Sequence, residues 1–342
     1  MKIKISNISQ SEDANNKKVK NTKKLDVWVL VDGVVGHANQ SLALARKLSD
    51  NYQIKKLEYN WTVRLPNFLL SSYPFHLKKD LLKEILSQKL PDVIISSGRR
   101  PAPLAIYLKK ISKGRTKIIQ IMRPNLNPKE FDLVILPQHD TYNHTLPNVV
   151  RIIGALNDIK NSLSDSRAAI KLNYPGVKNF IAVIIGGGSK AYDFTHANCM
   201  NLINSLKTIS ENHSLPLFIS FSRRTPKHVK ENFRRNFAEP NIIYDPEEKI
   251  PNPYPALIED AEYIIITADS ISMCSEAAST GKPIYIFCPK NFNLKKHKFF
   301  IQQLVDLGIA KRLEPETNFL VKYSYNILQE LDKVAKIVKN SI

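Results

Sequence analysis

The chain has 342 residues, of which 43% are hydrophobic and 24% are charged, so its composition argues against a fibrous or wholly disordered protein. Its length predicts two domains, at about 100–200 residues each. Lysine and arginine outnumber aspartate and glutamate by 50 to 31, a net charge of +19. Such a balance predicts an anionic partner, which leaves nucleic acid, an anionic membrane face and phosphorylated small molecules open.

The positive charge lies mainly in the first half of the chain. Residues 1–24 carry a net +5, residues 25–170 +9, residues 171–320 +3 and residues 321–342 +2. The first 24 residues have no apolar stretch and no arginine, so we interpret them as a disordered basic tail and not as a targeting signal. No apolar run reaches the roughly 18 residues that indicate a membrane-spanning helix. Three cysteines without metal-ligand spacing favour a cytoplasmic location.

From residue 25 onwards, short apolar segments alternate with amphipathic ones. In the first half we predict strands at 25–31, 92–96, 117–122 and 133–136, and helices near 42–48, 79–88 and 103–110. The pattern starts again at 180–185, with a helix near 198–210 and further strands at 217–221, 263–266 and 284–287. Short apolar strands that alternate with helices are typical of a parallel sheet covered on both faces.

The repeat predicts an α/β fold of two tandem Rossmann-like, doubly wound domains that face a cleft. We assign residues 25–165 to the first domain and 178–320 to the second, with a polar connection near 158–178. A terminal helix that packs on the body is predicted over 321–342, because four apolar residues recur there at helical spacing: Ile327, Leu331, Val334 and Val338. Ligands of such sheets bind at the carboxyl ends of the strands, where the motifs below lie.

A glycine-rich turn follows the first predicted strand of the second domain, formed by Gly186, Gly187, Gly188 and Ser189. It matches neither the dinucleotide fingerprint nor the P-loop. Glycine lets a backbone approach a ligand, and the next helix offers unpaired N–H groups, so the turn favours phosphate binding. The alternative is a tight strand-to-helix turn that needs glycine for packing alone.

Two further clusters follow strands of the second domain. Arg223 and Arg224 come after the strand at 217–221 and could hold a diphosphate through paired hydrogen bonds, although a solvated surface pair would look the same. Ser270 or Ser272 can cap the next helix and bind a phosphate oxygen, and Glu276 lies one turn beyond Ser272, where it could accept both hydroxyls of a ribose. A helix cap without any ligand is the alternative for this segment.

In the first domain, His37 ends a turn framed by Asp32 and Gly36 and could act as a general base, since an imidazole titrates near neutral pH. A structural histidine is the alternative. Polar residues after two other strands could hold an anionic acceptor or could be surface charge: Arg99 and Arg100, and His139 and Asp140.

Residues 61–79 combine aromatic and aliphatic side chains with basic ones. Trp61, Phe68 and Leu69 are followed by Tyr73, Phe75, Lys78 and Lys79. Such a segment could enter a membrane interface near a lipid acceptor, whereas core packing of a helix explains it equally well.

The same motifs, taken together, resemble the "elongated mitochondria" fission-factor family, whose bacterial members are usually described as predicted glycosyltransferases. The likeness covers about residues 25–320 and rests on the segments 28–33 with Gly36, His37 and Gln40, 96–101, 153–157, 222–226 and 267–276. That family is similar to the two-domain GT-B glycosyltransferases, which include the enzyme that makes the lipid-linked peptidoglycan precursor. The first turn of this chain departs from those enzymes, because it lacks their fuller run of glycines.

The resemblance implies a transfer of sugar from a nucleotide-diphosphate donor to an envelope glycan or lipid-linked acceptor, without a metal ion or other cofactor. It implies His37 as the base, the 186–189 turn and the helix start at Ser270–Ser272 as phosphate sites, and Glu276 as the ribose ligand. The concentration of positive charge in the tail and first domain favours a peripheral location on the cytoplasmic membrane face. The alternative is a non-enzymatic membrane adaptor on the same scaffold, because plant members act in organelle division. Binding to nucleic acid is not expected, since no known module accompanies the charge.

Overall fold

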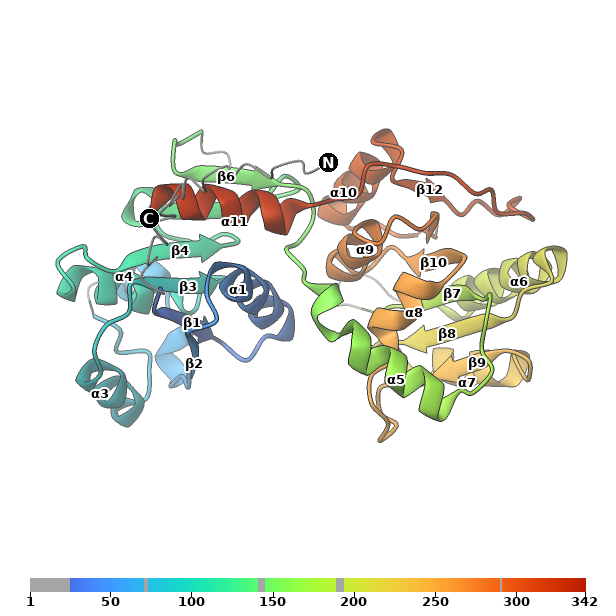
Figure 1. Ribbon diagram of the computed structural model, residues 1–342, viewed down its shortest axis with the longest axis horizontal. Helices are drawn as coiled ribbons and strands as arrows, with labels where there is room; N and C mark the ends of the chain where they lie inside the picture. Colours follow the sequence, from blue (N-terminus) through green and yellow to red (C-terminus); the bar gives the residue numbers. More distant parts are fainter. Residues whose placement is uncertain (1–24, 71–72, 141–144, 189–193, 290) are drawn as a thin grey trace, which may run out of the picture.

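The computed structural model describes residues 25–342 except 71–72, 141–144, 189–193 and 290, so the predicted tail at 1–24 and Ser189 lie outside it. The described residues form two six-stranded sheets in which all paired strands are parallel, so the predicted α/β fold with two sheets is confirmed. The arrows of β4 and β8 point toward the middle of the molecule from opposite sides (Figure 1). The carboxyl ends of the two sheets therefore face each other.

The first sheet has the order β2-β1-β3-β4-β5-β6. Its strands are β1 (Val27–Val31), β2 (Tyr52–Lys56), β3 (Val93–Ser97), β4 (Lys117–Ile121), β5 (Leu133–Pro137) and β6 (Val149–Ile152). The helices that connect them are α1 (Val35–Leu48), η1 (Trp61–Arg64), α2 (Asn67–Leu70), α3 (Lys79–Ser87), α4 (Ala102–Ile111) and η2 (Pro128–Glu130).

Alternate residues of β1 show why this sheet is covered on both faces. Val27 and Val29 pack with residues of α1 on one face, whereas Trp28 and Leu30 pack with residues of α3 and α4 on the other. All four side chains are at most 2% exposed. Since side chains of a strand alternate between its two faces, a run of apolar residues marks a strand buried on both.

The second sheet has the order β12-β11-β10-β7-β8-β9. Its strands are β7 (Ile181–Ile185), β8 (Leu217–Phe221), β9 (Ile242–Tyr244), β10 (Tyr263–Thr267), β11 (Ile284–Phe287) and β12 (Ala310–Arg312). Its helices are α6 (His196–His213), α7 (Lys227–Asn236), α8 (Tyr254–Asp260), α9 (Ile271–Ala278) and α10 (Lys295–Asp306). The order of this sheet corresponds to that of dinucleotide-binding folds, whereas the first sheet has the flavodoxin-like order with one added strand.

Two boundaries differ from the prediction. The connection at 158–178 is largely helical, with η3 (Ile159–Ser162) and α5 (Leu163–Asn173). The terminal helix, α11 (Glu330–Ser341), is shorter than the predicted 321–342, and Ile327 lies before it with 40% of its surface exposed.

Helix α11 packs on the first sheet, although it follows the second in sequence. Leu331, Val334 and Val338 belong to the same apolar cluster as Val27 and Val29. Helix α11 contacts α1 and lies on the side of the first half in Figure 1. The chain thus crosses twice between its halves, which fixes their relative position at two points. None of the described helices is long and apolar enough to cross a bilayer.

Candidate functional site

The first half places a histidine–aspartate pair where the strand order reverses, between β1 and β3. His37 lies in the first turn of α1, and its Nδ1 is 3.0 Å from Oδ2 of Asp32, whose side chain is 2% exposed. The ring lies against Gly98: a β-carbon added there would be 2.6 Å from Cε1 of His37. Because the side chain of His37 remains 24% exposed, Nε2 is the nitrogen free to exchange a proton with a ligand.

The environment of Asp32 keeps this carboxylate charged. Burial raises its pKa, but the hydrogen bond and charge of His37, the amide of Val34 and the charge of Arg100 outweigh burial and leave the pKa lowered. An ionised Asp32 that accepts the Nδ1 proton fixes the tautomer in which Nε2 is a base. The structure thus pairs His37 with Asp32, which the sequence placed only at the two ends of the same turn, and Arg100 lies close enough to interact with the pair.

Arg99 is used differently from the prediction. Its guanidinium donates to the carbonyl oxygen of Val63 at 3.1 Å and lies 3.4 Å from the carbonyl oxygen of Leu65 and from Oδ1 of Asn67. The side chain therefore holds the 61–70 segment onto the loop after β3.

The glycine turn of the second half lies between β7 and β10, where the order of that sheet reverses. The amide of Gly186 donates to Oγ1 of Thr267 at 2.8 Å, and the amide of Gly187 donates to Oδ2 of Asp269 at 2.7 Å. A β-carbon on Gly186 would collide with the carboxylate of Asp269, and one on Gly187 with the backbone of Arg224. Packing thus accounts for both glycines, and their amides are engaged within the protein. Gly188 is half-buried at the end of the described turn.

Asp269 is buried at the centre of this arrangement. Desolvation raises its pKa, although Thr267, the amide of Gly187 and the charge of Arg224 act in the opposite direction. The second half thus also holds a carboxylate at its switch point, but it bonds to the loop beside it and not to a histidine.

Helix α9 carries the predicted donor residues to the junction of the two halves. Ser270 caps the helix, with its side chain 3.4 Å from the amide of Met273, as predicted. Ser272 faces the first half, since a β-carbon on Gly36 would lie 3.9 Å from its Oγ. The predicted acceptor and donor segments therefore meet at Gly36 and Ser272.

Glu276 lines a cavity of about 260 Å³ between the halves, together with Arg46 of α1 and Tyr254 of α8. The hydroxyl of Tyr254 donates to Oε2 of Glu276 at 2.8 Å. Burial raises the pKa of Glu276 to about 7, with the Tyr254 hydrogen bond acting against it. A carboxylate with one fixed donor and remaining acceptor capacity can receive the hydroxyls of a bound polyol.

A second cavity, of about 360 Å³, shares Asn252 and Tyr254 with the first. It is also lined by Arg223 and Tyr244, which lie after β8 and at the end of β9, and by Met273 of α9. An aromatic ring, a thioether and a guanidinium around such a volume suit a planar, polar ring. Arg223 and Glu276 thus lie on adjoining cavities.

A cationic cluster that the sequence analysis missed lies at the start of α10. Three lysines, Lys295, Lys296 and Lys298, occupy the first turn, where the helix dipole disfavours positive charge, together with His297, whose pKa is lowered by burial and by neighbouring positive charge. His297 is bonded to the backbone of Asp269 and interacts electrostatically with Arg224. The available signal was the run of basic residues itself, which begins eight positions after the end of the predicted strand at 284–287.

His139 and Asp140 contact this helix across the junction. Oδ1 of Asp140 is 3.3 Å from Nζ of Lys296, and the ring centroids of His139 and Phe300 are 5.7 Å apart. Burial, together with the charges of Lys296 and His297, lowers the pKa of His139 to about 4, although the charge of Asp140 acts in the opposite direction. A neutral, buried His139 serves contact between the halves and is not suited to hold an anion by charge.

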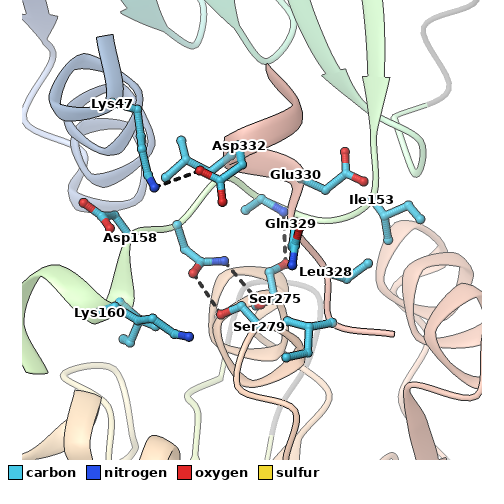
Figure 2. Close-up of a pocket in the computed structure, with 15 residues that line it drawn as sticks. Lys47, Ile153, Asp158, Lys160, Ser275, Ser279, Leu328, Gln329, Glu330 and Asp332 are labelled. Atoms are coloured by element: carbon cyan, nitrogen blue, oxygen red, sulfur yellow. Dashed lines mark hydrogen bonds and ion pairs between the residues drawn. The ribbon is translucent and has the colours of Figure 1, made fainter. Parts of the chain in front are cut away.

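Figure 2 shows a cavity of about 190 Å³ where α1, the 153–160 segment, α9 and the start of α11 meet. Oγ of Ser275 accepts from the amide of Ala155 at 3.0 Å, and the side chain of Asn157 donates to the carbonyl oxygen of Ser275 at 3.3 Å. Lys47 and Asp332 form an ion pair at 2.8 Å. These contacts couple α9 to the chain crossing, so Ser275 has a structural role.

Residues 35–342 match the family described as mitochondrial fission ELM1. The chain belongs to this family. Two relatives are similar to this chain in sequence. An uncharacterized protein of Rickettsia prowazekii is 42% identical over 92% of this chain and 98% of its own length. The mitochondrial fission protein ELM1 of Arabidopsis thaliana is 23% identical over 77% of this chain and 66% of its own length.

Solved structures share the fold of this ELM1-family chain. The UDP-GlcNAc 2-epimerase of Methanocaldococcus jannaschii covers 92% of the chain and all of its own, with a TM-score of 0.57 and 11% identity. Its complex with UDP-GlcNAc and UDP aligns with a TM-score of 0.53 at 12% identity. At such identities the likeness establishes the two-domain GT-B-like architecture alone. The prediction of that architecture is confirmed.

Proposed function

We propose that this protein is a glycosyltransferase that moves a sugar from a nucleotide-diphosphate donor to a hydroxyl of an envelope glycan or lipid-linked acceptor. The observation that carries the proposal is the meeting of a histidine–aspartate pair from one sheet with a carboxylate-bearing helix from the other. The complex of a solved structure of the same fold with UDP-GlcNAc and UDP supports a nucleotide-sugar ligand.

The donor nucleotide would occupy the second half. Glu276 would accept the ribose hydroxyls, with Tyr254 orienting the carboxylate from 2.8 Å. The base would enter the adjoining cavity of about 360 Å³ beside Tyr244 and Arg223. Placing a ribose at Glu276 requires the ionised carboxylate, since both sugar hydroxyls act as donors.

The diphosphate would lie between the start of α9 and the cations of Arg224 and α10. Ser270 and Ser272 bring hydroxyls to the helix start, and His297 lies within electrostatic reach of Arg224. Because the amides of Gly186 and Gly187 are engaged, Gly188 is the described part of that turn left for a phosphate in this proposal. Positive charge around a leaving diphosphate stabilises the charge that develops as it departs.

In the transfer step, Nε2 of His37 takes the proton of the acceptor hydroxyl while the acceptor oxygen forms a bond with the anomeric carbon. The bond between that carbon and the diphosphate oxygen breaks, and its electron pair leaves with the nucleoside diphosphate. Asp32 holds the opposite ring nitrogen and stabilises the imidazolium that forms. Arg100, which interacts with Asp32, and Gly36 lie on the acceptor side.

Family membership favours a second candidate, a membrane-associated adaptor that keeps the scaffold without turnover, because the Arabidopsis relative is named a mitochondrial fission protein. In that case the His37–Asp32 pair would serve structure alone.

Turnover separates the two candidates. The full chain is incubated with a panel of nucleotide-diphosphate sugars and membrane glycolipid extract, and release of nucleoside diphosphate is measured. We expect release that is abolished in His37→Ala and retained in His196→Ala, which replaces an exposed histidine of the second half. A folded wild-type protein that releases no nucleotide from any donor would refute the enzyme and favour the adaptor.

A further inference from the structure

Five large apolar side chains are exposed on one stretch of the first half. Trp61 is 76% exposed and Phe68 69%, and the set is completed by Leu69, Tyr73 and Phe75 at 41–48%. We call these five residues the apolar rim. Large apolar side chains gathered on a surface mark an interaction site more often than single exposed ones do.

The apolar rim is held firmly despite its exposure. Asn67 is 3% exposed, and its Nδ2 donates to the carbonyl oxygens of Arg99 and Pro124, both at 2.7 Å. The guanidinium of Arg99 binds back to the carbonyl oxygen of Val63. Nε2 of His76 lies 3.2 Å from the carbonyl oxygen of Arg100, which ties down the far end of the stretch. The exposed side chains thus project from a fixed base.

The anchors place the apolar rim beside the His37–Asp32 pair. Arg99, Arg100 and Pro124 lie in the loops after β3 and β4, at the carboxyl edge of the first sheet. Gly98, the residue before Arg99, packs against the ring of His37. The apolar rim therefore borders the acceptor side of the site.

The charge of this stretch is uniformly positive. Residues 61–79 contain Arg64, Lys78 and Lys79 and no acidic residue, and all three cations are exposed. Aromatic side chains with neighbouring cations suit the headgroup region of an anionic bilayer, where rings enter the interface and cations meet the lipid phosphates. A surface that binds a protein would be expected to carry hydrogen-bonding groups among its aromatic rings as well.

We propose that the apolar rim, with Arg64 and Lys79, docks the protein on an anionic lipid bilayer. The docked face borders the His37–Asp32 pair, so an acceptor carried by the bilayer would reach the site from the membrane side. This inference goes beyond the proposed transfer reaction, because docking requires no nucleotide and no turnover.

Vesicle sedimentation of the full chain tests the proposal. We expect the protein to sediment with vesicles of equal parts phosphatidylcholine and phosphatidylglycerol, and Trp61→Ser/Phe68→Ser to bind at least ~10-fold more weakly. The matched control, Leu172→Ser/Phe319→Ser, removes two side chains that are 76% and 57% exposed elsewhere and should bind like wild type. Arg64→Gln/Lys79→Gln should lose the preference for the anionic lipid.

Circular dichroism and thermal unfolding establish that each variant is folded. Equal binding by the rim variant and its control would overturn the proposal, as would equal binding of wild type to pure phosphatidylcholine vesicles. Absence of wild-type binding to both vesicle types would also overturn it and would favour a protein partner. None of these outcomes depends on nucleotide-sugar turnover, so the docking proposal can fail while the proposed function stands.

Discussion

In each half of the molecule, a glycine at the switch point of the sheet packs against a polar side chain. The aspartate at that point has a lowered pKa in the first half and a raised pKa in the second. In each, a glycine after one strand of the switch point lies against a polar side chain from the other: Gly98 against His37, and Gly186 against Asp269. Asp32 is paired with a histidine and its pKa is lowered, whereas Asp269 accepts from Thr267 and from the amide of Gly187 in the neighbouring loop, and its pKa is raised. The first arrangement can exchange a proton with a ligand, and the second stabilises a turn.

This contrast suggests that the halves divide the chemistry. In the proposed function, the first half supplies His37 as the base beside an exposed apolar and basic surface, and the second supplies Glu276 and Arg223, which line two adjoining cavities. The distribution of charge agrees with such a division, since residues 25–170 carry +9 and residues 171–320 only +3. Binding to an anionic surface is favoured by positive charge spread over a face of the protein, whereas binding of a nucleotide requires a few groups at defined positions.

The largest expected effect concerns the pair in the first half. Asp32→Asn removes the acceptor that fixes the His37 tautomer, so turnover of a nucleotide sugar should fall about 100-fold or more. The matched control is Asp132→Asn in the same half, where the carboxylate pairs with Lys109 at 2.9 Å, and it should stay within about 3-fold of wild type. An Asp32→Asn enzyme as active as this control would show that the pair is structural.

A glycine-to-alanine substitution at the switch point should lower the free energy of unfolding more in the second half than in the first. Gly186→Ala forces a methyl group into the buried carboxylate of Asp269 and should lower the free energy of unfolding by about 1–3 kcal/mol. Gly36→Ala meets only Oγ of Ser272, at 3.9 Å, and should stay within about 1 kcal/mol of wild type because alanine favours the helix. Denaturant titration measures both, and equal losses would contradict the packing role of Gly186.

The smallest effect is the pH dependence that Glu276 contributes, which is read as the difference between wild type and variant because His139 of the first half, whose pKa is lowered to about 4, contributes a slope of opposite sign. Folding raises the pKa of Glu276 from 4.5 to about 7, so across that window the folded state keeps a proton that the unfolded state has lost. The free energy of unfolding should therefore fall as pH rises from 4.5 to about 7, by about 1–3 kcal/mol from this group. Glu276→Gln should lose this slope, and Glu314→Gln, at an exposed site, should retain it. A slope that persists in Glu276→Gln would refute the assignment.

Much of the fold follows from the sequence because the inner strands are continuous apolar runs. Strands β8 and β11 have the predicted ranges, Leu217–Phe221 and Ile284–Phe287. The four strands that were missed, β2, β6, β9 and β12, are the edges of the two sheets. Edge strands are partly exposed, and β2 even reads Tyr-Gln-Ile-Lys-Lys, so they lack the apolar signal of a strand buried on both faces.

The site was predictable in its residue types but less so in its contacts. The pairing of His37 with Asp32 and the cap at Ser270 follow from local spacing. The use of Arg99 as an anchor and of Thr267 and Asp269 as partners for the glycine amides depends on neighbours that are far apart in sequence. Strand order and the return of α11 to the first sheet are non-local for the same reason.

Calorimetric binding of uridine diphosphate at pH 8 to wild type, Glu276→Ala and His37→Ala tests the division between the halves most directly. We expect Glu276→Ala to weaken binding by about 10–100-fold, because the ribose loses a charged acceptor. His37→Ala should bind within about 2-fold of wild type, since its side chain serves the acceptor. Unchanged binding by Glu276→Ala, or an equal loss in His37→Ala, would contradict the account.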